Sequence, residues 1–278
     1  MKFKTIFFLF NIVLIIAFLF VLLMPILLIG QNYFSLFISK DWYVLVLFFL
    51  CIAGVNIYFI LNWKLFRLLE TEDWQMLSRY LEEQVYKKKR IRKIYVKMLL
   101  NVYFLNSEMD KINKLEEYLK NEKPQYLLYF SVEFGIPYLI NSDAVSSESY
   151  FGKLLASRKT ANVEWIRWNY AFALMQKKEF EAAKAELLKL YGESTNPLIF
   201  LLTLYLLDSF AKMDIGVKSK VDEGIKKLRN MYGLKKIDKE LESNSDNIEV
   251  VILSQIIREA KERYLTAESN RFTPDTVN

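Results

Sequence analysis

The chain has 278 residues, a hydrophobic content of 53% and a formal net charge of +6, with one cysteine and no histidine. The lack of histidine excludes Ser-His-Asp and Cys-His catalysis and histidine metal ligands. The mild positive charge does not indicate a nucleic-acid ligand, and no P-loop, dinucleotide-binding or metalloprotease motif occurs. We therefore expect a non-enzymatic protein without catalytic residues, cofactor or metal site, although carboxylate- or lysine-based chemistry stays open.

Two apolar stretches come first in the chain. No charged residue occurs in residues 5–39 or 42–63, and each stretch holds a run of about 20 apolar residues, the length that spans a bilayer core as a helix. We predict transmembrane helices over residues 5–29 and 42–61, within an anchor of residues 1–62. The alternative for the first helix is a cleaved signal peptide, but its apolar core is longer than that of a signal and "LLIGQ" lacks an A-x-A pattern.

The charges that flank the predicted spans indicate their orientation. Two spans place both chain ends on one side of the membrane, and the flanks on that side carry Lys2, Lys4, Lys64 and Arg67. The short loop between the spans carries one basic and one acidic residue. Because basic flanks mark the cytoplasmic side, we predict a bacterial inner-membrane protein whose large domain faces the cytoplasm.

After the second span the pattern becomes that of an all-α fold. Apolar residues recur every three or four positions from residue 62 to residue 264. The segment "WNYAFALMQKKEFEAAKAELLKL" (168–190) holds two such stripes around a short polar turn, with small residues Ala171 and Ala183 that let two antiparallel helices approach closely. With Phe180 opening its second helix, this segment resembles the tetratricopeptide repeat, a helix–turn–helix of about 34 residues.

The same frame extends along the chain. Trp74, Met109 and Phe180 each open a predicted second helix, at intervals of 35 and 71 residues, and the longer interval leaves room for one more unit. The resemblance implies a superhelix of helical hairpins over residues 63–265. We expect residues 266–278 to be a disordered tail.

The last part of this predicted superhelix has two notable segments. The run "NPLIFLLTLYLLDSF" is too short for a third span and is expected in the core of the last repeat. Asn196 would cap its helix and Pro197 would occupy the first turn. A helix from Ile248 to about Tyr264 is expected to cap the stack.

The passage from the second span into the first repeat contains no glycine or proline. The repeat frame starts the first repeat helix near Tyr58, inside the span, so we predict one continuous helix through Leu69 that fixes the orientation of the superhelix. The following helix would run back toward the bilayer and bring a basic cluster to headgroup level. We predict contact with anionic lipid, against a solvated helix end as the alternative. The basic cluster consists of Lys87, Lys88, Lys89, Arg90, Arg92 and Lys93.

Tetratricopeptide stacks bind other proteins along a concave groove that is lined by their first helices. The resemblance places six residues on that face as candidates for partner binding. The alternative is that the aromatic members pack between helices, whereas two exposed tryptophans would form a functional patch. The six residues are Lys97, Asn101, Phe104, Trp165, Trp168 and Phe172.

The anchor followed by "LFRLLETEDWQMLSRYLEEQV" also resembles membrane-anchored repeat proteins of spirochaetes, which include components of the flagellar-motor collar. That resemblance implies a periplasmic repeat domain, opposite to the side predicted from the basic flanks. We predict a membrane-anchored scaffold whose partners are other proteins of a membrane complex. The alternatives are an accessory subunit of a membrane enzyme or transporter and an assembly factor of the cytochrome-maturation type.

Overall fold

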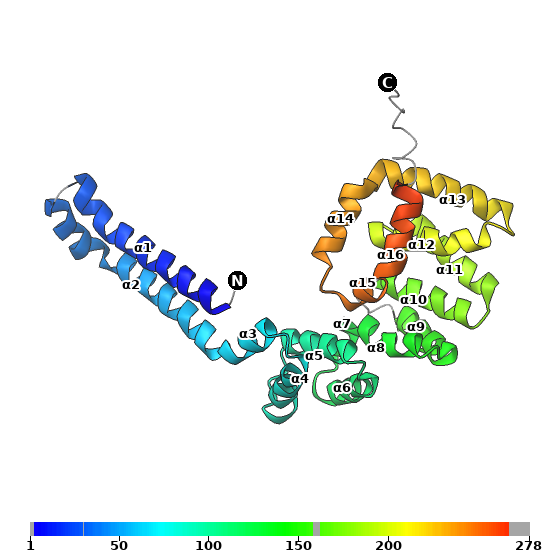
Figure 1. The fold of residues 1–278 in the computed structure, drawn as a ribbon, viewed down its shortest axis with the longest axis horizontal. Coiled ribbons are helices and arrows are strands. Elements are labelled where there is room, and N and C mark those ends of the chain that lie inside the picture. Colours follow the sequence, from blue (N-terminus) through cyan, green and yellow to red (C-terminus); the bar gives the residue numbers. More distant parts are fainter. Residues whose placement is uncertain (1–2, 30, 158–161, 267–278) are drawn as a thin grey trace, which may run out of the picture. The chain divides into compact units, whose positions relative to one another are not determined.

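The computed structural model describes residues 3–29, 31–157 and 162–266, and these residues form helices joined by turns and short loops, with no strand among them. The all-α prediction is confirmed. The chain forms two compact units, Met1–Tyr95 and Val96–Asn278 (Figure 1). The domain boundaries predicted at residues 62 and 265 stay predictions. Of the tail expected over residues 266–278, residue 266 ends a helical turn, and residues 267–278 lie outside the described residues.

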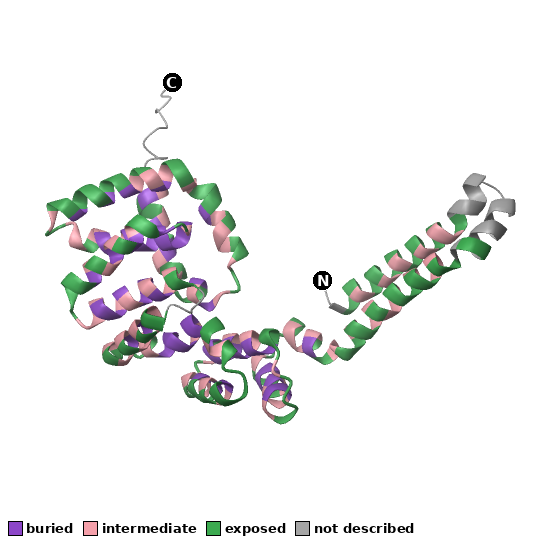
Figure 2. Cartoon of the chain, turned by 180° about the vertical axis from the view of Figure 1, so that it is seen from behind, coloured by how far each residue is buried: buried purple, intermediate pink, exposed green. Residues whose placement is uncertain are grey.

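The N-terminal unit begins with a hairpin of two long apolar helices, α1 (Phe3–Ile29) and α2 (Gln31–Leu61). They lie side by side in Figure 1, with Phe18 and Phe48 stacked at 5.7 Å between ring centroids. Lys4–Leu23 and Trp42–Leu61 are long and apolar enough to cross a membrane, and neither window is buried inside the structure. Figure 2 accordingly shows most of this hairpin as exposed.

The second apolar helix does not continue unbroken into the next helix. Helix α2 ends at Leu61 and α3 (Trp63–Glu70) begins two residues later, with Asn62 at φ −103° and ψ 9° between them. The Asn62 side chain and backbone N–H both donate to the carbonyl of Tyr58, at 2.8 and 3.2 Å. An asparagine that bonds to the preceding turn in this way favours a bend. The predicted break-free helix is therefore wrong at this one residue.

Aromatic packing surrounds the bend. The ring of Trp63 lies edge-on to Phe7 of α1 at 5.8 Å, and Phe66 of α3 lies 5.6 Å from Phe59 of α2. Helix α4 (Trp74–Glu82) then packs on α3 and ends in a π-helical turn, η1 (Glu83–Lys87). The joint is thus a packed bend rather than a flexible linker.

The C-terminal unit is a succession of helices in which each packs on the next from α8 to α13. Helix α5 begins just before this unit. The helices are α5 (Lys93–Leu105), α6 (Met109–Glu122), α7 (Gln125–Tyr129), α8 (Ser131–Ile140), α9 (Ala144–Ser157), α10 (Val163–Gln176), α11 (Phe180–Glu193), α12 (Pro197–Phe210), α13 (Ile215–Lys227), η2 (Leu228–Tyr232), α14 (Gly233–Ser243), α15 (Ile248–Ile252), α16 (Ser254–Lys261) and η3 (Glu262–Thr266).

One turn recurs through both units. An acidic residue stands directly before the second helix of each hairpin, at intervals of 35, 35, 36 and 35 residues. In the first four turns the residue before the acid has a positive φ of 51–66°, and the N–H of the acid donates to the carbonyl five residues back. This is the hydrogen bond of a Schellman helix end. The acidic residues are Asp73, Glu108, Asp143, Glu179 and Asp214.

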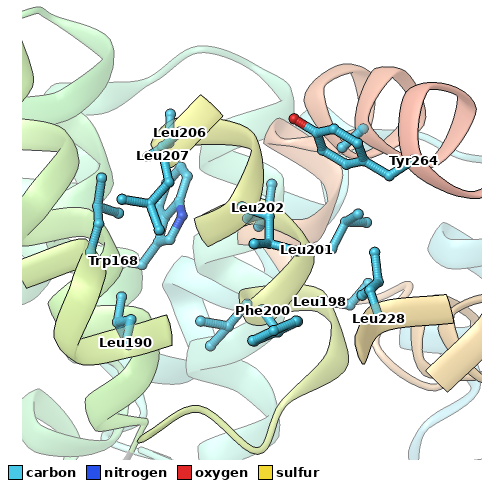
Figure 3. Close-up of a cluster of buried hydrophobic side chains, with 14 of the residues drawn as sticks. Trp168, Leu190, Leu198, Phe200, Leu201, Leu202, Leu206, Leu207, Leu228 and Tyr264 are labelled. Carbon is cyan, nitrogen blue, oxygen red and sulfur yellow. The ribbon is translucent and has the colours of Figure 1, made fainter. Parts of the chain in front are cut away.

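The core of the C-terminal unit is built around α12, which is apolar on all sides and carries ten buried residues (Figure 3). Its predicted start is confirmed: the Asn196 side chain accepts hydrogen bonds from the N–H groups of Leu198 and Ile199, and Pro197 occupies the first turn. Trp168 and Tyr264 pack into the same cluster from α10 and η3.

The end of the chain folds back onto the preceding helices. Helix α15 packs on α8 and α16 packs on α12. The single capping helix predicted from Ile248 is therefore wrong in one respect, because Leu253 (φ −86°, ψ 5°) interrupts it. The break lets α15 pack on α8 and α16 pack on α12.

Candidate functional site

A cavity of 590 Å³ lies inside the C-terminal unit, with walls from α5, α7, α8, α10, the start of α12 and the α14–α15 connection. It is called the acidic cavity here because three glutamates line it and Lys97 is its one basic lining residue among those described. The rings of Tyr129 and Trp165 belong to its wall. The three glutamates are Glu133, Glu164 and Glu249.

Glu164, in the first turn of α10, ties that helix to the loop before α12. Its carboxylate accepts hydrogen bonds from the Ser194 hydroxyl at 2.6 Å, from the Thr195 N–H and hydroxyl at 3.3 and 3.2 Å, and from the Asn196 N–H at 3.4 Å. A carboxylate shared by this many donors fixes the loop against the start of the helix. Glu164 therefore has a structural role in the wall of the acidic cavity.

Glu133 of α8 and Glu249 of α15 differ from Glu164, because no other described residue donates a hydrogen bond to either carboxylate. Burial, followed by the nearby charge of Glu249, raises the pKa of Glu133 to about 8. Burial also raises the pKa of Glu249. Lys97 opposes both shifts only weakly, since its ammonium is already bonded elsewhere. The cavity thus holds two partly buried carboxyls that lack a close counter-ion.

Two of the predicted groove residues contact the chain's own C-terminal segment. The Lys97 ammonium donates to the carboxylate of Asp246 at 2.6 Å and to the side-chain oxygen of Asn247 at 3.1 Å. The Asn101 side chain donates to the carbonyl of Asp246 at 3.3 Å, and the bond from Lys97 lowers the pKa of the Asp246 carboxyl. Phe104, on the same helix, is buried. The segment before α15 therefore lies across this part of the predicted groove.

The predicted aromatic stripe of α10 is split between two cavities. Trp165 is half-buried and lines the acidic cavity. Trp168 is only 1% exposed and stacks on Phe172, with ring centroids 5.6 Å apart and an interplanar angle of 6°. Both line a smaller, apolar cavity of 220 Å³ against α15 and α16. Of the two alternatives left open by the sequence, Trp168 follows the second: it packs between helices because α12 and α16 enclose it.

The basic cluster occupies a loop rather than a helix end. Helical structure stops at Lys87 and resumes at Lys93, with Lys89 at φ 50° between them. All six basic residues are exposed. Lys88 forms an ion pair with Glu83 at 2.9 Å, and the Arg92 guanidinium lies 5.7 Å from the ring centroid of Tyr95. The headgroup depth predicted for the cluster depended on an unbroken helix, so it no longer follows.

Sequence reasoning missed Glu133 and Glu249 as residues of a site. A signal existed, because each is a lone carboxylate in an apolar run, "SVEFGIPYLI" and "IEVVI". A charge at such a position is expensive to bury unless it is paired. Their proximity in the fold could not be predicted from local sequence, because 116 positions separate them along the chain.

A model of a family described as "Uncharacterised Treponema protein" matches residues 111–266. The chain belongs to this family. The match runs from α6 to the end of η3, and so contains Glu133, Glu164 and Glu249 but not Lys97 or Asn101. The residues matched by this Treponema family therefore include most of those that line the acidic cavity.

A Treponema pallidum (strain Nichols) protein described as "Uncharacterized protein" is 29% identical over 161 residues, which is 58% of this chain and 51% of the relative. The chain thus spans about half the length of that relative. No solved structure matches the chain.

Proposed function

We propose that this protein is a non-enzymatic scaffold of the bacterial inner membrane that holds other proteins of a membrane complex. The observation that carries the proposal is the succession of helical hairpins with turns every 35 or 36 residues, following two helices long enough to span a bilayer. Stacked hairpins of this kind offer extended surfaces to partner proteins. The anchor would keep such a surface at the membrane.

We further propose that the hairpins are divergent tetratricopeptide repeats. The turn interval is close to the repeat length of about 34 residues. Ala171 and Ala183, assigned to the two small positions of the repeat, are fully buried where α10 and α11 pack together. The π-turns and the broken helix at Phe130 depart from a regular repeat.

The partner surface is proposed to centre on Trp165 and on Lys97 and Asn101, beside the segment that precedes α15. The test is a photo-crosslinking amino acid placed at residue 165 of the full chain, with residue 153 on the exposed side of α9 as the matched control. A scaffold that uses this surface gives a defined protein adduct from residue 165 and none from residue 153. Equal labelling at both positions would contradict the assignment.

The repeat-bearing part is proposed to face the cytoplasm, on the basis of Lys4, Lys64 and Arg67; Lys2 lies outside the described residues. A reporter that works only in the cytoplasm, fused after Asn278, should be active. If that reporter is silent and an export-dependent reporter is active, the domain is periplasmic. That second result would favour the setting suggested by the collar resemblance, in which the protein belongs to a spirochaete flagellar motor.

We also propose that the basic cluster contacts anionic lipid, an attraction of about 1 kcal/mol per basic residue near the surface. In a Cys51→Ser background, a fluorophore at Lys87→Cys should transfer energy to headgroup-labelled lipid when nanodiscs contain anionic lipid. Arg90→Gln with Arg92→Gln should reduce the transfer. Transfer that is the same with neutral lipid would refute the contact.

A further inference from the structure

The acidic cavity has the size and the charge of a ligand site. Its volume of 590 Å³ falls within the range of about 300–1,000 Å³ typical of pockets for small molecules. Three carboxyl groups line it against one ammonium, and Asp246 already binds that ammonium. Once Glu133 and Glu249 are ionised, the carboxylates of the wall outnumber its ammonium group, so an added cation would be attracted and an added anion repelled.

Two of the lining glutamates have no partner group from another described residue. Glu249 is partly buried and lines the acidic cavity, and no other described residue donates a hydrogen bond to its carboxylate. Glu133 lines the same cavity and is close enough for the two charges to repel each other. Ionised carboxylates that are partly withdrawn from water are destabilised unless a counter-ion joins them.

The aromatic residues of the wall suit the same ligand. Tyr129 from α7 and Trp165 from α10 line the acidic cavity together with the carboxyls. Tryptophan and tyrosine rings attract ammonium and guanidinium groups, and the attraction is stronger where water is excluded. Carboxylates and aromatic rings in one cavity therefore favour an organic cation over a bare metal ion, which would require several oxygen ligands at short distance.

We propose that the acidic cavity binds a cationic organic group, an alkylammonium or a guanidinium, between the Glu133 and Glu249 carboxyls and beside the rings of Tyr129 and Trp165. The group belongs either to a free amine or to a lysine or arginine side chain of a bound protein segment. Binding of a free amine does not depend on the scaffold function proposed above. Binding of a lysine or arginine side chain rests on that function, because the side chain would belong to a partner protein.

Binding of the cation should release a proton from Glu133. Glu133 faces Lys97 of α5, Glu164 of α10 and Glu249 of α15 in the cavity wall, and it holds its proton to about pH 8. A cation stabilises the ionised carboxyls, so it must displace that proton. Affinity should therefore rise with pH up to about pH 8, and binding should release protons to the buffer.

The test is titration calorimetry on the full chain in nanodiscs with three probes. These are 1,5-diaminopentane, acetyl-Ala-Arg-Ala-amide and the neutral peptide acetyl-Ala-Gln-Ala-amide. We expect the two cationic probes to bind and the neutral peptide not to bind. Tighter binding of the arginine peptide than of the diamine would identify a side chain as the source, and the reverse order would identify a free amine.

Substitutions then locate the site. Glu249→Gln and Glu133→Gln should each weaken cation binding about tenfold or more, because each removes a charge that pairs with the ligand. Glu242→Gln, on the exposed surface of α14, is the matched control and should leave binding unchanged. Proton release by the unmodified chain, measured in buffers of different ionisation enthalpy, gives a second readout that does not depend on the folding of any variant. Absence of cation binding at millimolar concentration, or binding that survives both substitutions, would overturn the proposal, as would binding without proton release.

Discussion

Helices α1 and α12 are both strongly apolar, but their surroundings are opposite. Helix α1 has 27 residues and exposes large side chains such as Phe8, Ile16 and Phe20, each at least 60% accessible. Helix α12 has 14 residues, and other helices bury ten of them (Figures 2 and 3). At 1.5 Å per residue the first is about 40 Å long and the second about 21 Å, against a bilayer core of about 30 Å. Length, more than apolar content, separates a membrane span from a core helix.

The largest effect should come from the core around α12. Trp168→Ala removes a buried ring and should lower the free energy of unfolding by about 3–5 kcal/mol, measured by chemical denaturation followed by circular dichroism. Phe8→Ala in the exposed face of α1 should leave that transition unchanged, and Trp165→Ala should have a smaller effect than Trp168→Ala. A Trp168→Ala variant of normal stability that has lost its partner would restore the binding role expected from the sequence.

The next effect concerns α1 itself. Ile16 lies near the middle of the helix and is 60% exposed. Ile16→Arg should disfavour membrane insertion by about 2.5–3.5 kcal/mol, the cost of an arginine at the centre of a span. Alkaline extraction of membranes should then release more of the variant than of the unmodified protein, with Ile16→Leu as the matched control. Equal retention of both variants would mean that α1 does not span the bilayer.

Glycines in the C-terminal unit and in the apolar hairpin differ in the space around them. A Cβ at Gly135 of α8 would lie 2.3 Å from Cζ of the buried Phe151 and 2.9 Å from Cε1 of Tyr150, whose hydroxyl is held by the carbonyl of Ser131. Gly135→Ala should therefore destabilise the C-terminal unit by about 1–3 kcal/mol.

The control for this prediction is Gly54→Ala in α2, where no described atom lies within 4 Å of the added Cβ. It should leave thermal unfolding unchanged. If both alanine variants behaved alike, the close packing of α8 against α9 would be wrong.

The last prediction concerns the change in stability for each unit of pH. Glu133 loses its proton near pH 4.5 in an unfolded chain but only near pH 8 in the folded one, because burial raises its pKa. Between these values the folded state holds more protons, so stability should fall as pH rises, by up to about 1.4 kcal/mol per pH unit. Urea unfolding at pH 5 to pH 8 measures this slope, and Glu133→Gln should flatten it. A stability that increases over this range would contradict the buried state of Glu133.

Much of the architecture follows from local sequence, and the exceptions have physical causes. Apolar periodicity was sufficient to predict the hairpins and the buried position of α12. The bend at Asn62 was missed because a side chain that competes for a backbone carbonyl leaves the apolar pattern unchanged.

The candidate site was harder to predict than the fold. Lys97 meets Asp246 across 149 positions of the chain, a contact without any local signal. The enclosure of Trp168 depends in the same way on helices that come later in the sequence.

Because the same turn recurs, one whole repeat can be removed between two equivalent turns. Residues 108–142 amount to one complete period, and they begin and end at equivalent points of two turns. Joining Ser107 directly to Asp143 would place a left-handed serine before a helix-capping aspartate, as Ser142 does in the intact protein. Deletion of residues 108–142 would remove the α7 and α8 walls of the acidic cavity, while each remaining turn would keep its acidic residue. A single in-frame deletion would thus remove one repeat without disrupting a turn.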